Sequence, residues 1–300
     1  MAKAVYVGVG SKARKMKKAY IGIGGKARKV KKMYIGVGGK ARLCYSAEAD
    51  KFGTATPLSK YRTLLAGTTV GGYALFGGGS YDSDAKKGEA IMDAYNASLT
   101  RTTATPLPSN VYACAGGTVG GYAVFSGGSS MNSDSTLVET IGAMEIVRAY
   151  DSSLTSSKAA PLSCPRAVHS AATIGNHLLF AGGYSDTTGK YLSTVESYDA
   201  SLTRSTAVEL SSAKNGLASA TVGEYAMFAG GYKGNSDAAY VATVDAYNTA
   251  LTKTTMPDLS VGRYGLASAV IGDYALFAGG ISKISSTIDK YQDVVDVYSA

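Results

Sequence analysis

Few residues in the chain are of the types that carry out covalent chemistry, and their spacing does not group them. The 300 residues include two histidines, His169 and His177, and three cysteines, Cys44, Cys114 and Cys164. The cysteines are too far apart for a zinc site and too few for a disulfide framework, so we interpret them as small core residues. The sequence has no phosphate-binding loop and no Gly-x-Ser-x-Gly motif. We therefore expect no enzymatic activity and no cofactor.

Oxygen-bearing side chains recur in three short segments and could in principle bind a cation. The pairs are Asp82 and Asp84, Asn132 and Asp134, and Asn235 and Asp237. Carboxylate and amide oxygens are calcium ligands, but these pairs lack the longer ligand series and the terminal Glu of an EF-hand. Hydrogen bonds from side chain to backbone within turns explain them more simply. We expect loop residues and no metal site.

A repeat of about 50 residues positions these segments. A hydrophobic phrase ending in a double glycine occurs five times, with its first glycine at Gly78, Gly127, Gly182, Gly230 and Gly279. An aligned tyrosine follows each phrase, at Tyr95, Tyr150, Tyr198, Tyr247 and Tyr298. Short strand-like segments bounded by turn residues at this period indicate propeller blades rather than a helical solenoid. In the last unit the first strand is predicted at 265–272 and the second at 274–280. The third strand ends at the aligned tyrosine, and a fourth starts at Ser-Leu-Thr.

These units resemble kelch repeats over residues 45–300. The resemblance is carried by PRAVHSAATIGNHLLFAGG followed by VESYD, with a basic residue before the first strand. Two features depart from the kelch pattern. The usual Trp is absent, with Leu99, Leu154, Leu202 and Leu251 nearby as substitutes, and Val111 occupies the basic position of the second unit.

The two ends of the repeat region predict how the ring closes. The chain stops at VYSA, directly after the third strand of the fifth unit, which therefore lacks its fourth strand. Residues 44–59 begin with the same Tyr-Ser-Ala and end like a fourth strand. We predict a five-bladed all-β propeller in which this N-terminal strand completes the last blade and leaves no open edge.

The loops between the second and third strands are the candidate ligand-binding face. Nearly all length variation of the repeat falls there, and variable loops on a rigid scaffold are where recognition usually resides. The loops are rich in Tyr, Ser, Gly, Asn and Asp, which suit protein surfaces and sugars, although ordinary solvated turns are the alternative. The candidate residues are Tyr81, Asp82, Asp84, Asn132, Asp134, Tyr184, Asp186, Tyr232, Asn235 and Asp237.

Four basic residues before the first strands are further candidates. Arg62, Arg166, Lys214 and Arg263 are expected near the same face, around the channel mouth. The kelch resemblance implies that such residues hold acidic peptides, since guanidinium groups match carboxylates geometrically. The alternative is structural, with the cations capping loop carbonyls.

Residues 1–43 form a separate basic region, and residues 44–300 form the propeller. The phrases YVGVGSKAR, YIGIGGKAR and YIGVGGKAR repeat every 14 residues, and alternation of apolar residues with glycine predicts three short hairpins. Hairpins this small need a partner surface, so we expect an anchor or an oligomerisation element. The anchor residues are Tyr6, Tyr20, Tyr34, Arg14, Arg28 and Arg42.

The net charge of +8 combines a strongly basic head with a mildly acidic body. The cations could meet an acidic protein partner, an acidic cell-envelope polymer or nucleic acid, of which nucleic acid is disfavoured because no aromatic stacking groove accompanies them. No signal peptide and no membrane-spanning segment is predicted.

The basic phrases followed by a repeat domain resemble virion or tail-associated proteins of phages and prophages from Gram-positive hosts. The resemblance implies a virion protein, made in the host cytoplasm, whose head binds virion or tail proteins and whose propeller binds a host-surface glycan or protein. A cytosolic kelch scaffold for protein–protein interaction is the alternative.

Overall fold

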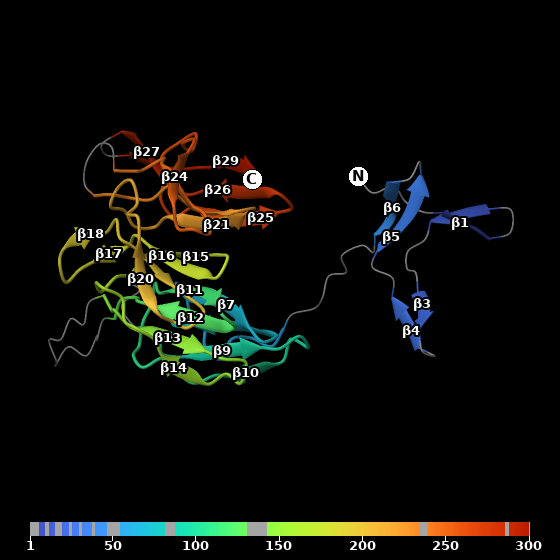
Figure 1. Cartoon of the computed structure of the whole chain (residues 1–300), viewed down its shortest axis with the longest axis horizontal. Coiled ribbons are helices and arrows are strands. Elements are labelled where there is room, and N and C mark those ends of the chain that lie inside the picture. The colour runs from blue at the N-terminus through green and yellow to red at the C-terminus, as the bar shows by residue number, and fades with distance from the viewer. Residues whose placement is uncertain are drawn as a thin grey trace. The chain divides into compact units, whose positions relative to one another are not determined.

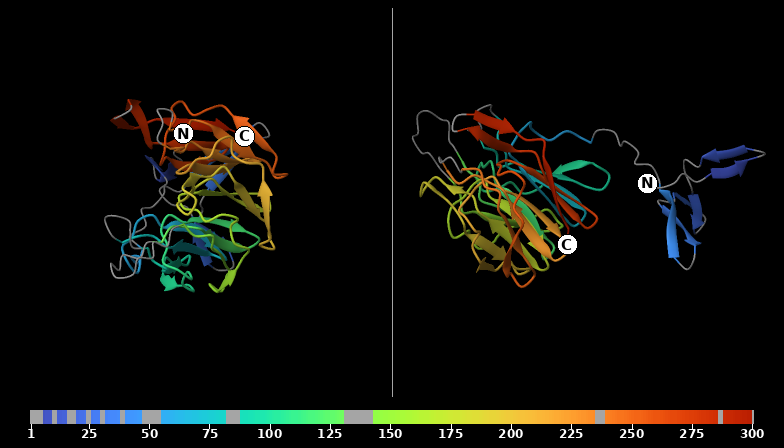
Figure 2. Two further views of the ribbon diagram at one scale, coloured as in Figure 1. Left: turned by 90° about the vertical axis from the view of Figure 1, so that its left-hand side faces the viewer. Right: turned by 90° about the horizontal axis from the view of Figure 1, so that it is seen from above.

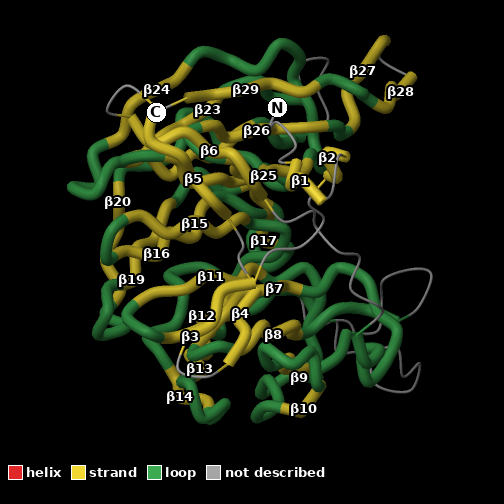
Figure 3. Tube along the Cα trace, turned by 90° about the vertical axis from the view of Figure 1, so that its right-hand side faces the viewer, coloured by secondary structure: helices red, strands yellow, loops and turns green. Residues whose placement is uncertain are grey.

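The computed structural model describes residues 6–9, 12–15, 20–23, 26–29, 32–37, 40–46, 55–81, 88–130, 143–234, 239–285 and 288–299. The chain divides into two compact units, residues 1–54 and residues 55–300, whereas the sequence placed this boundary after residue 43. Every regular element of the described residues is a β-strand, which confirms the all-β prediction (Figure 3). The described part of the chain contains no helix long and apolar enough to cross a membrane.

The first unit contains one antiparallel hairpin for each 14-residue phrase. β1 (Tyr6–Val9) pairs with β2 (Lys12–Lys15), β3 (Tyr20–Ile23) with β4 (Lys26–Lys29), and β5 (Lys32–Val37) with β6 (Lys40–Ser46). The three registers are equivalent, because Val7 lies opposite Arg14, Ile21 opposite Arg28 and Ile35 opposite Arg42. The predicted hairpins are therefore confirmed, while their glycine turns lie outside the described residues.

The second unit is a series of five antiparallel sheets, one for each 50-residue repeat (Figure 1, Figure 2). Sheet 1 contains β7 (Ala66–Val70), β8 (Tyr73–Gly77), β9 (Met92–Tyr95) and β10 (Arg101–Thr103). Sheet 2 contains β11 (Ala115–Val119), β12 (Tyr122–Ser126), β13 (Val147–Tyr150) and β14 (Ser156–Lys158). Sheet 3 contains β15 (Ser170–Ile174), β16 (His177–Ala181), β19 (Val195–Tyr198) and β20 (Arg204–Ala207).

Sheet 4 contains β21 (Ala218–Val222), β22 (Tyr225–Ala229), β23 (Val244–Tyr247) and β24 (Lys253–Met256). Sheet 5 contains β25 (Ala267–Ile271), β26 (Tyr274–Ala278) and β29 (Val295–Ser299). Two small hairpins stand outside the sheets, β17 (Tyr184–Ser185) with β18 (Lys190–Tyr191) and β27 (Ile281–Ser285) with β28 (Ile288–Tyr291). The strand pairing is that of a propeller, in which sequential strands form each sheet.

The turn between the third and fourth strands shows how local sequence sets the repeat. In sheet 3, the carboxylate of Asp199 accepts hydrogen bonds from the amides of Ser201 and Thr203, both 2.9 Å long. This side chain to backbone turn leaves Leu202 at φ +61°. The equivalent leucines of the four units all occupy this left-handed position, at Leu99, Leu154, Leu202 and Leu251. Leu154, Leu202 and Leu251 also pack against the apolar cores between sheets.

Small residues on the first strands allow neighbouring sheets to approach closely. β7, β11, β15, β21 and β25 lie next to one another in that order. The hydroxyls of Thr118, Thr173 and Thr221 each donate to a carbonyl of the preceding sheet, at Thr69, Thr118 and Thr173, over 2.7 to 3.0 Å. The innermost strands are thus linked by side chains rather than by a continuous backbone ladder.

Four apolar cores in the described residues lie between successive sheets. Each contains an edge-to-face Phe–Tyr pair with ring centroids 5.7 to 5.9 Å apart. The pairs are Phe125–Tyr150, Phe180–Tyr198, Phe228–Tyr247 and Phe277–Tyr298, from sheets 2, 3, 4 and 5. Each pair packs on the apolar face of the preceding sheet. Every inner sheet therefore turns its Phe–Tyr face toward the sheet before it and its other apolar face toward the sheet after it.

The two end sheets keep the corresponding faces uncovered. In sheet 1 the equivalent pair, Phe76 and Tyr95, belongs to none of these four cores. In sheet 5, Ile271, Val295 and Val297 are 69%, 50% and 56% exposed. Their equivalents in sheet 4 are buried beneath sheet 5, at Val222, Val244 and Ala246. Among the described residues, the sheets therefore make a series with two open ends.

The predicted closing strand is only partly tested. Cys44, Tyr45 and Ser46 belong to β6, so their assignment to the last sheet is wrong. The amide and hydroxyl of Ser59 donate to Asp93 of sheet 1. Ser163, which follows β14 of sheet 2, donates to Glu196 of sheet 3 in the same way, so this contact is compatible with a fourth strand before Ser59. In the linkers before sheets 1, 3, 4 and 5, a Leu-Ser pair places the serine on an acid of the following sheet, at Ser59, Ser163, Ser211 and Ser260. Residues 47–54 lie outside the described residues, and closure of the ring through them stays a prediction.

Candidate ligand-binding face

The double glycines fix the place where each loop leaves its sheet. In sheet 3, Gly182 and Gly183 have φ of +69° and +108°, a region that favours glycine. The amide of Gly183 donates to the carbonyl of Lys214, 2.9 Å away, at the entrance to sheet 4. A Cβ on Gly182 would lie 2.6 Å from that same oxygen. The loop base is therefore bonded to the next sheet, and its position is set by the scaffold.

Buried ion pairs reinforce this edge in four of the five sheets. In sheet 3, Arg166 lies 2.7 Å from Glu196 and donates to the carbonyls of Gly182 and Thr194, both at 3.1 Å. The same arrangement joins Arg62 to Asp93 at 2.8 Å, Lys214 to Asp245 at 3.5 Å, and Arg263 to Asp296 at 2.8 Å. A serine from the entering linker donates to the acid in each case, at Ser59, Ser163, Ser211 and Ser260.

These contacts favour a structural role for the basic residues over a role in ligand binding. The side chains of Arg62, Arg166, Lys214 and Arg263 are fully buried. Burial lowers the pKa of Arg166 and of Lys214, and the neighbouring acids oppose that change. The cations cap loop carbonyls and neutralise internal acids, which is the structural alternative. As ligand contacts they are not accessible, because no part of their charged groups reaches the surface.

Sheet 2 lacks this ion pair because both partners are changed. Val111 occupies the basic position and is buried, while Arg148 on β13 stands where the other sheets have an acid. An acid left at position 148 would be buried without its partner, which is costly. The sequence showed the departure at Val111, but pairing it with Arg148 required the register of the sheet.

Five tyrosines from three sheets meet on the loop face. Tyr191 contacts Tyr184 and Tyr232, with ring centroids 5.1 and 5.7 Å apart. Tyr232 in turn contacts Tyr240 at 5.5 Å and Tyr264 at 6.1 Å. All five rings are half-buried. We call this group the tyrosine cluster. Sequence reasoning selected Tyr184 and Tyr232 but missed the other three. Tyr191 and Tyr240 lie in the loops that follow the double glycines, and Tyr264 directly follows Arg263 in the segment that enters sheet 5.

The other predicted loop residues separate into two groups. Asp82, Asp84, Asn132, Asp134, Asn235 and Asp237 lie outside the described residues. Tyr81 is described and its ring lies beneath the ammonium of Lys60, 3.4 Å from the ring centroid, far along the chain from the tyrosine cluster. Asp186 accepts hydrogen bonds from the amides of Ala143 and Thr187, so its carboxylate holds loop backbone. The described residues contain no group of three or more potential metal-ligating side chains.

The histidines and Cys114 occupy packing positions. Burial, with the charge of Arg166, lowers the pKa of His169 to about 3, and its Nε2 lies 2.8 Å from the hydroxyl of Ser126. His177 begins β16 at the place held by tyrosine in the other sheets, and its Nδ1 lies 3.0 Å from the Ser197 hydroxyl. Burial raises the pKa of Cys114 to about 11.

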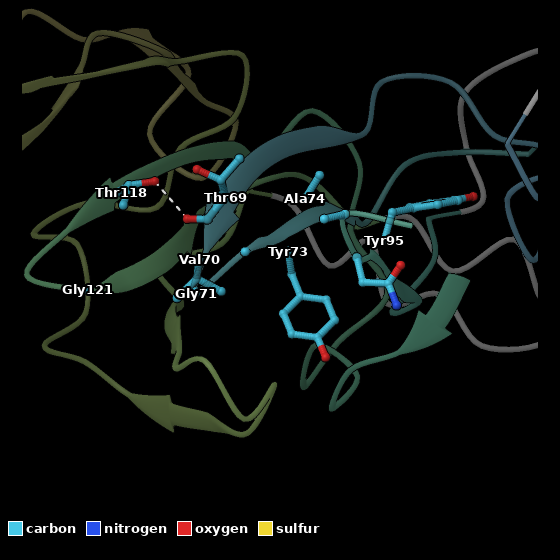
Figure 4. Close-up of a pocket in the computed structure, with 11 residues that line it drawn as sticks. Thr69, Val70, Gly71, Tyr73, Ala74, Tyr95, Thr118 and Gly121 are labelled. Carbon is cyan, nitrogen blue, oxygen red and sulfur yellow. Dashed lines mark hydrogen bonds between the residues drawn. The ribbon is translucent and has the colours of Figure 1, made fainter. Parts of the chain in front are cut away.

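Two hollows lie beside sheet 1. One, of about 530 Å³, is lined by residues including Tyr73, Tyr95 and Asn96. Figure 4 shows the bond from Thr118 to Thr69 on one side of it and the Tyr73 and Tyr95 rings on the other. The second, of about 650 Å³, is lined mainly by apolar residues around Phe76. Neither lining includes a carboxylate, a basic side chain or a cysteine. The second hollow lies on the uncovered face beside Phe76 and Tyr95, whereas the first also borders Thr118 and Gly121 of sheet 2.

Comparisons with known proteins agree with this architecture. Residues 165–201, which span sheet 3 up to its third strand, match the Kelch motif. The solved structure entitled "Structure of YjhT" superposes with a TM-score of 0.60 at 16% sequence identity, and the match covers 94% of this chain and 95% of that one. At this identity the similarity establishes the fold alone. A search of the curated proteins found no match.

Proposed function

We propose that the chain is a non-enzymatic attachment protein of a virion. Its propeller binds a host-surface glycan or protein through the loop face, and its basic hairpins hold it on the particle. The observation that carries this proposal is the loop face itself. Loops of different length leave equivalent double-glycine positions. In sheets 1 to 4 a backbone bond ties the loop base to the next sheet, and in four sheets a buried ion pair stabilises the same edge from within its own sheet. A rigid scaffold with variable loops is the usual basis of recognition.

Ring closure belongs to the same proposal. The face of sheet 5 that carries Ile271, Val295 and Val297 has the apolar residue types on which the Phe–Tyr pairs of the other sheets pack. Among the described sheets, the pair of Phe76 and Tyr95 is the one that packs in no apolar core. We propose that these two faces pack together and that residues 47–54 add the fourth strand beside β29. Burying three large apolar side chains would stabilise the closed ring by several kcal/mol, at about 1.5–3 kcal/mol each.

The closure proposal predicts different effects for two truncations. Deletion of residues 1–46 should leave the thermal stability of the propeller nearly unchanged, whereas deletion of residues 1–54 should lower it clearly and expose the apolar face of sheet 5 to the dye ANS. Differential scanning calorimetry and ANS fluorescence measure both. Equal stability of the two truncated chains would show that residues 47–54 are not part of a sheet.

The hairpin unit supports the anchoring role. Its three hairpins share one register, in which Arg14, Arg28 and Arg42 lie opposite Val7, Ile21 and Ile35, so the same pairing occurs three times. Repetition of one weak contact raises the overall affinity for a repetitive partner such as a virion or a second copy of the chain. Tyr6, Tyr20 and Tyr34 begin the central Tyr-x-Gly phrase of each hairpin, and Arg14, Arg28 and Arg42 lie on the returning strands.

A cytosolic kelch scaffold is the second candidate, and the match of residues 165–201 to the Kelch motif favours it equally. The two functions differ in where the protein is found. Mass spectrometry of purified virions should detect the chain, and the purified protein should bind host cells. Replacing residues 82–87, 131–142 and 235–238 by Gly-Ser linkers of equal length should abolish that binding. Absence from virions together with recovery in complexes of soluble cellular proteins would refute the virion role in favour of the scaffold.

A further inference from the structure

The tyrosine cluster is built into the scaffold rather than carried on free loops. Tyr184 and Tyr232 directly follow the double glycines of sheets 3 and 4, and each pairs with the strand entering its own sheet, at Ala167 and Asn215. Tyr191 is held by the β17–β18 hairpin opposite Tyr184. In sheets 1 and 2 the residues at the positions of Tyr184 and Tyr232 are the buried Ser80 and Ser129. The five contacting rings of the cluster therefore come from sheets 3 to 5.

Two glycines make room for the rings. A Cβ on Gly216 would lie 2.0 Å from Cε2 of Tyr264, and one on Gly234 would lie 3.3 Å from Cε2 of Tyr191. Each ring thus lies over the backbone of a neighbouring sheet. The ring contacts join sheet 3 to sheet 4 and sheet 4 to sheet 5, so the cluster keeps its shape when a ligand binds. Rings held in advance lose little conformational entropy on binding.

The chemistry of the cluster points to a sugar. A tyrosine combines an apolar ring with a polar hydroxyl group. The ring contacts of the cluster join five tyrosines and involve no Leu, Met or Phe. Partial burial and the neighbouring tyrosines raise the pKa of Tyr191, so its hydroxyl stays a donor at neutral pH. A pyranose ring has the complementary composition, with an apolar face of C–H groups and hydroxyls at its rim. A protein hot spot would combine such rings with a more apolar or an Arg-containing surround.

We propose that the tyrosine cluster is a subsite that stacks a neutral hexopyranose unit of a glycan. This inference rests on the loop-face function proposed above and assigns it a ligand class and three further residues, Tyr191, Tyr240 and Tyr264. The half-exposed rings supply stacking area and their hydroxyls bond the sugar hydroxyls.

The full-length protein should be applied to an array of immobilised neutral and acidic oligosaccharides, and its dissociation constants for the best neutral glycans should then be measured. Tyr191→Ala should weaken binding at least tenfold, while Tyr191→Phe, which keeps the ring, should stay within about threefold. Tyr274→Ala removes an exposed tyrosine at the tight turn between β25 and β26, the opposite end of the strands from the loops, and should change nothing.

Two glycine variants provide a matched test that leaves every tyrosine in place. Gly216 and Gly265 occupy equivalent positions with φ of +59° and +66°, and Ala113 takes the same conformation in sheet 2. A Cβ at Gly265 meets nothing within 4 Å, whereas one at Gly216 displaces the Tyr264 ring. Gly216→Ala should therefore weaken glycan binding at least fivefold, and Gly265→Ala should not, with the melting temperatures of both variants as the check on folding.

The results can distinguish failure of the sugar-subsite proposal from failure of the proposed binding to host cells through the loop face. If the protein binds host cells through its loops but no glycan on the array, the sugar assignment is wrong and a protein ligand takes its place. If it binds neutral glycans and Tyr191→Ala and Gly216→Ala bind equally well, the tyrosine cluster is not the subsite. Binding only to acidic glycans would also overturn the inference. Loss of cell binding by the loop-replaced chain, measured in parallel, reports on the proposed function alone.

Discussion

Removal of the Arg166 guanidinium should destabilise the second unit strongly. The side chain is fully buried, lies 2.7 Å from Glu196 and donates to two carbonyls. In Arg166→Met the Glu196 carboxylate, 1% exposed, loses its close cation, and leaving one member of a buried pair costs about 3–5 kcal/mol. The two carbonyls that lose a donor add to this cost. We expect a loss of about 4 kcal/mol in the free energy of unfolding.

The double variant tests the electrostatic explanation. In Arg166→Met with Glu196→Leu neither charge is buried alone, and Ser163, which donates to Glu196, is exposed enough to bond water instead. We expect at least 2 kcal/mol of the loss to be recovered, since apolar replacement of a whole buried pair is often neutral. Sheet 2 provides a natural precedent, because Val111 and Arg148 replace both members of its pair.

Urea unfolding followed by tyrosine fluorescence suits the chain, which has 22 Tyr and no Trp. Arg204→Met is the matched control, because Arg204 lies 3.9 Å from the same carboxylate with a side chain 34% exposed. It should cost no more than about 1 kcal/mol. A loss below 1 kcal/mol in Arg166→Met, or a double variant no more stable than the single one, would refute the reasoning.

Three further predictions concern one buried and two half-buried side chains. His169 has a folded-state pKa of about 3 against 6.5 in the unfolded chain, so its stabilisation is present above pH 6.5 and is lost as the pH falls toward 3. Between pH 6.5 and 5 the wild type should lose about 2 kcal/mol more than His169→Gln in urea titrations. The Cys114 thiol, with its pKa raised to about 11, should react with iodoacetamide at pH 8 only after unfolding, as mass spectrometry would show. Thr221→Val removes the 2.8 Å bond to the Thr173 carbonyl and should cost about 1 kcal/mol, and a cost near zero would show that this link between inner strands is not stabilising.

The sequence predicted those parts of the fold that repeat. The double glycines, the tight turns and the aligned tyrosines impose the same local geometry in every unit, so strand order and hairpin registers could be anticipated. The role of the basic residues could not be decided, because Arg166 and Glu196 are 30 residues apart and only the register of sheet 3 brings them together. The tyrosine cluster was missed for a similar reason. Tyr191, Tyr232 and Tyr264 come from three different repeats, and no pattern within one repeat indicates their contact.

The exception in sheet 2 shows that the ion pairs are a property of each repeat and not of the five sheets as a whole. If the buried cations formed a shared binding site around the axis, loss of one at Val111 would not require a change on β13. If each cation neutralises an acid within its own sheet, the acid must disappear with it, and Arg148 stands in its place. The paired loss therefore favours a structural role for Arg62, Arg166, Lys214 and Arg263, and it leaves ligand recognition to the side chains beyond the double glycines. A chain in which Val111→Arg and Arg148→Asp restore the pair should be at least as stable as the wild type and should bind the same ligand, because the loop face is untouched.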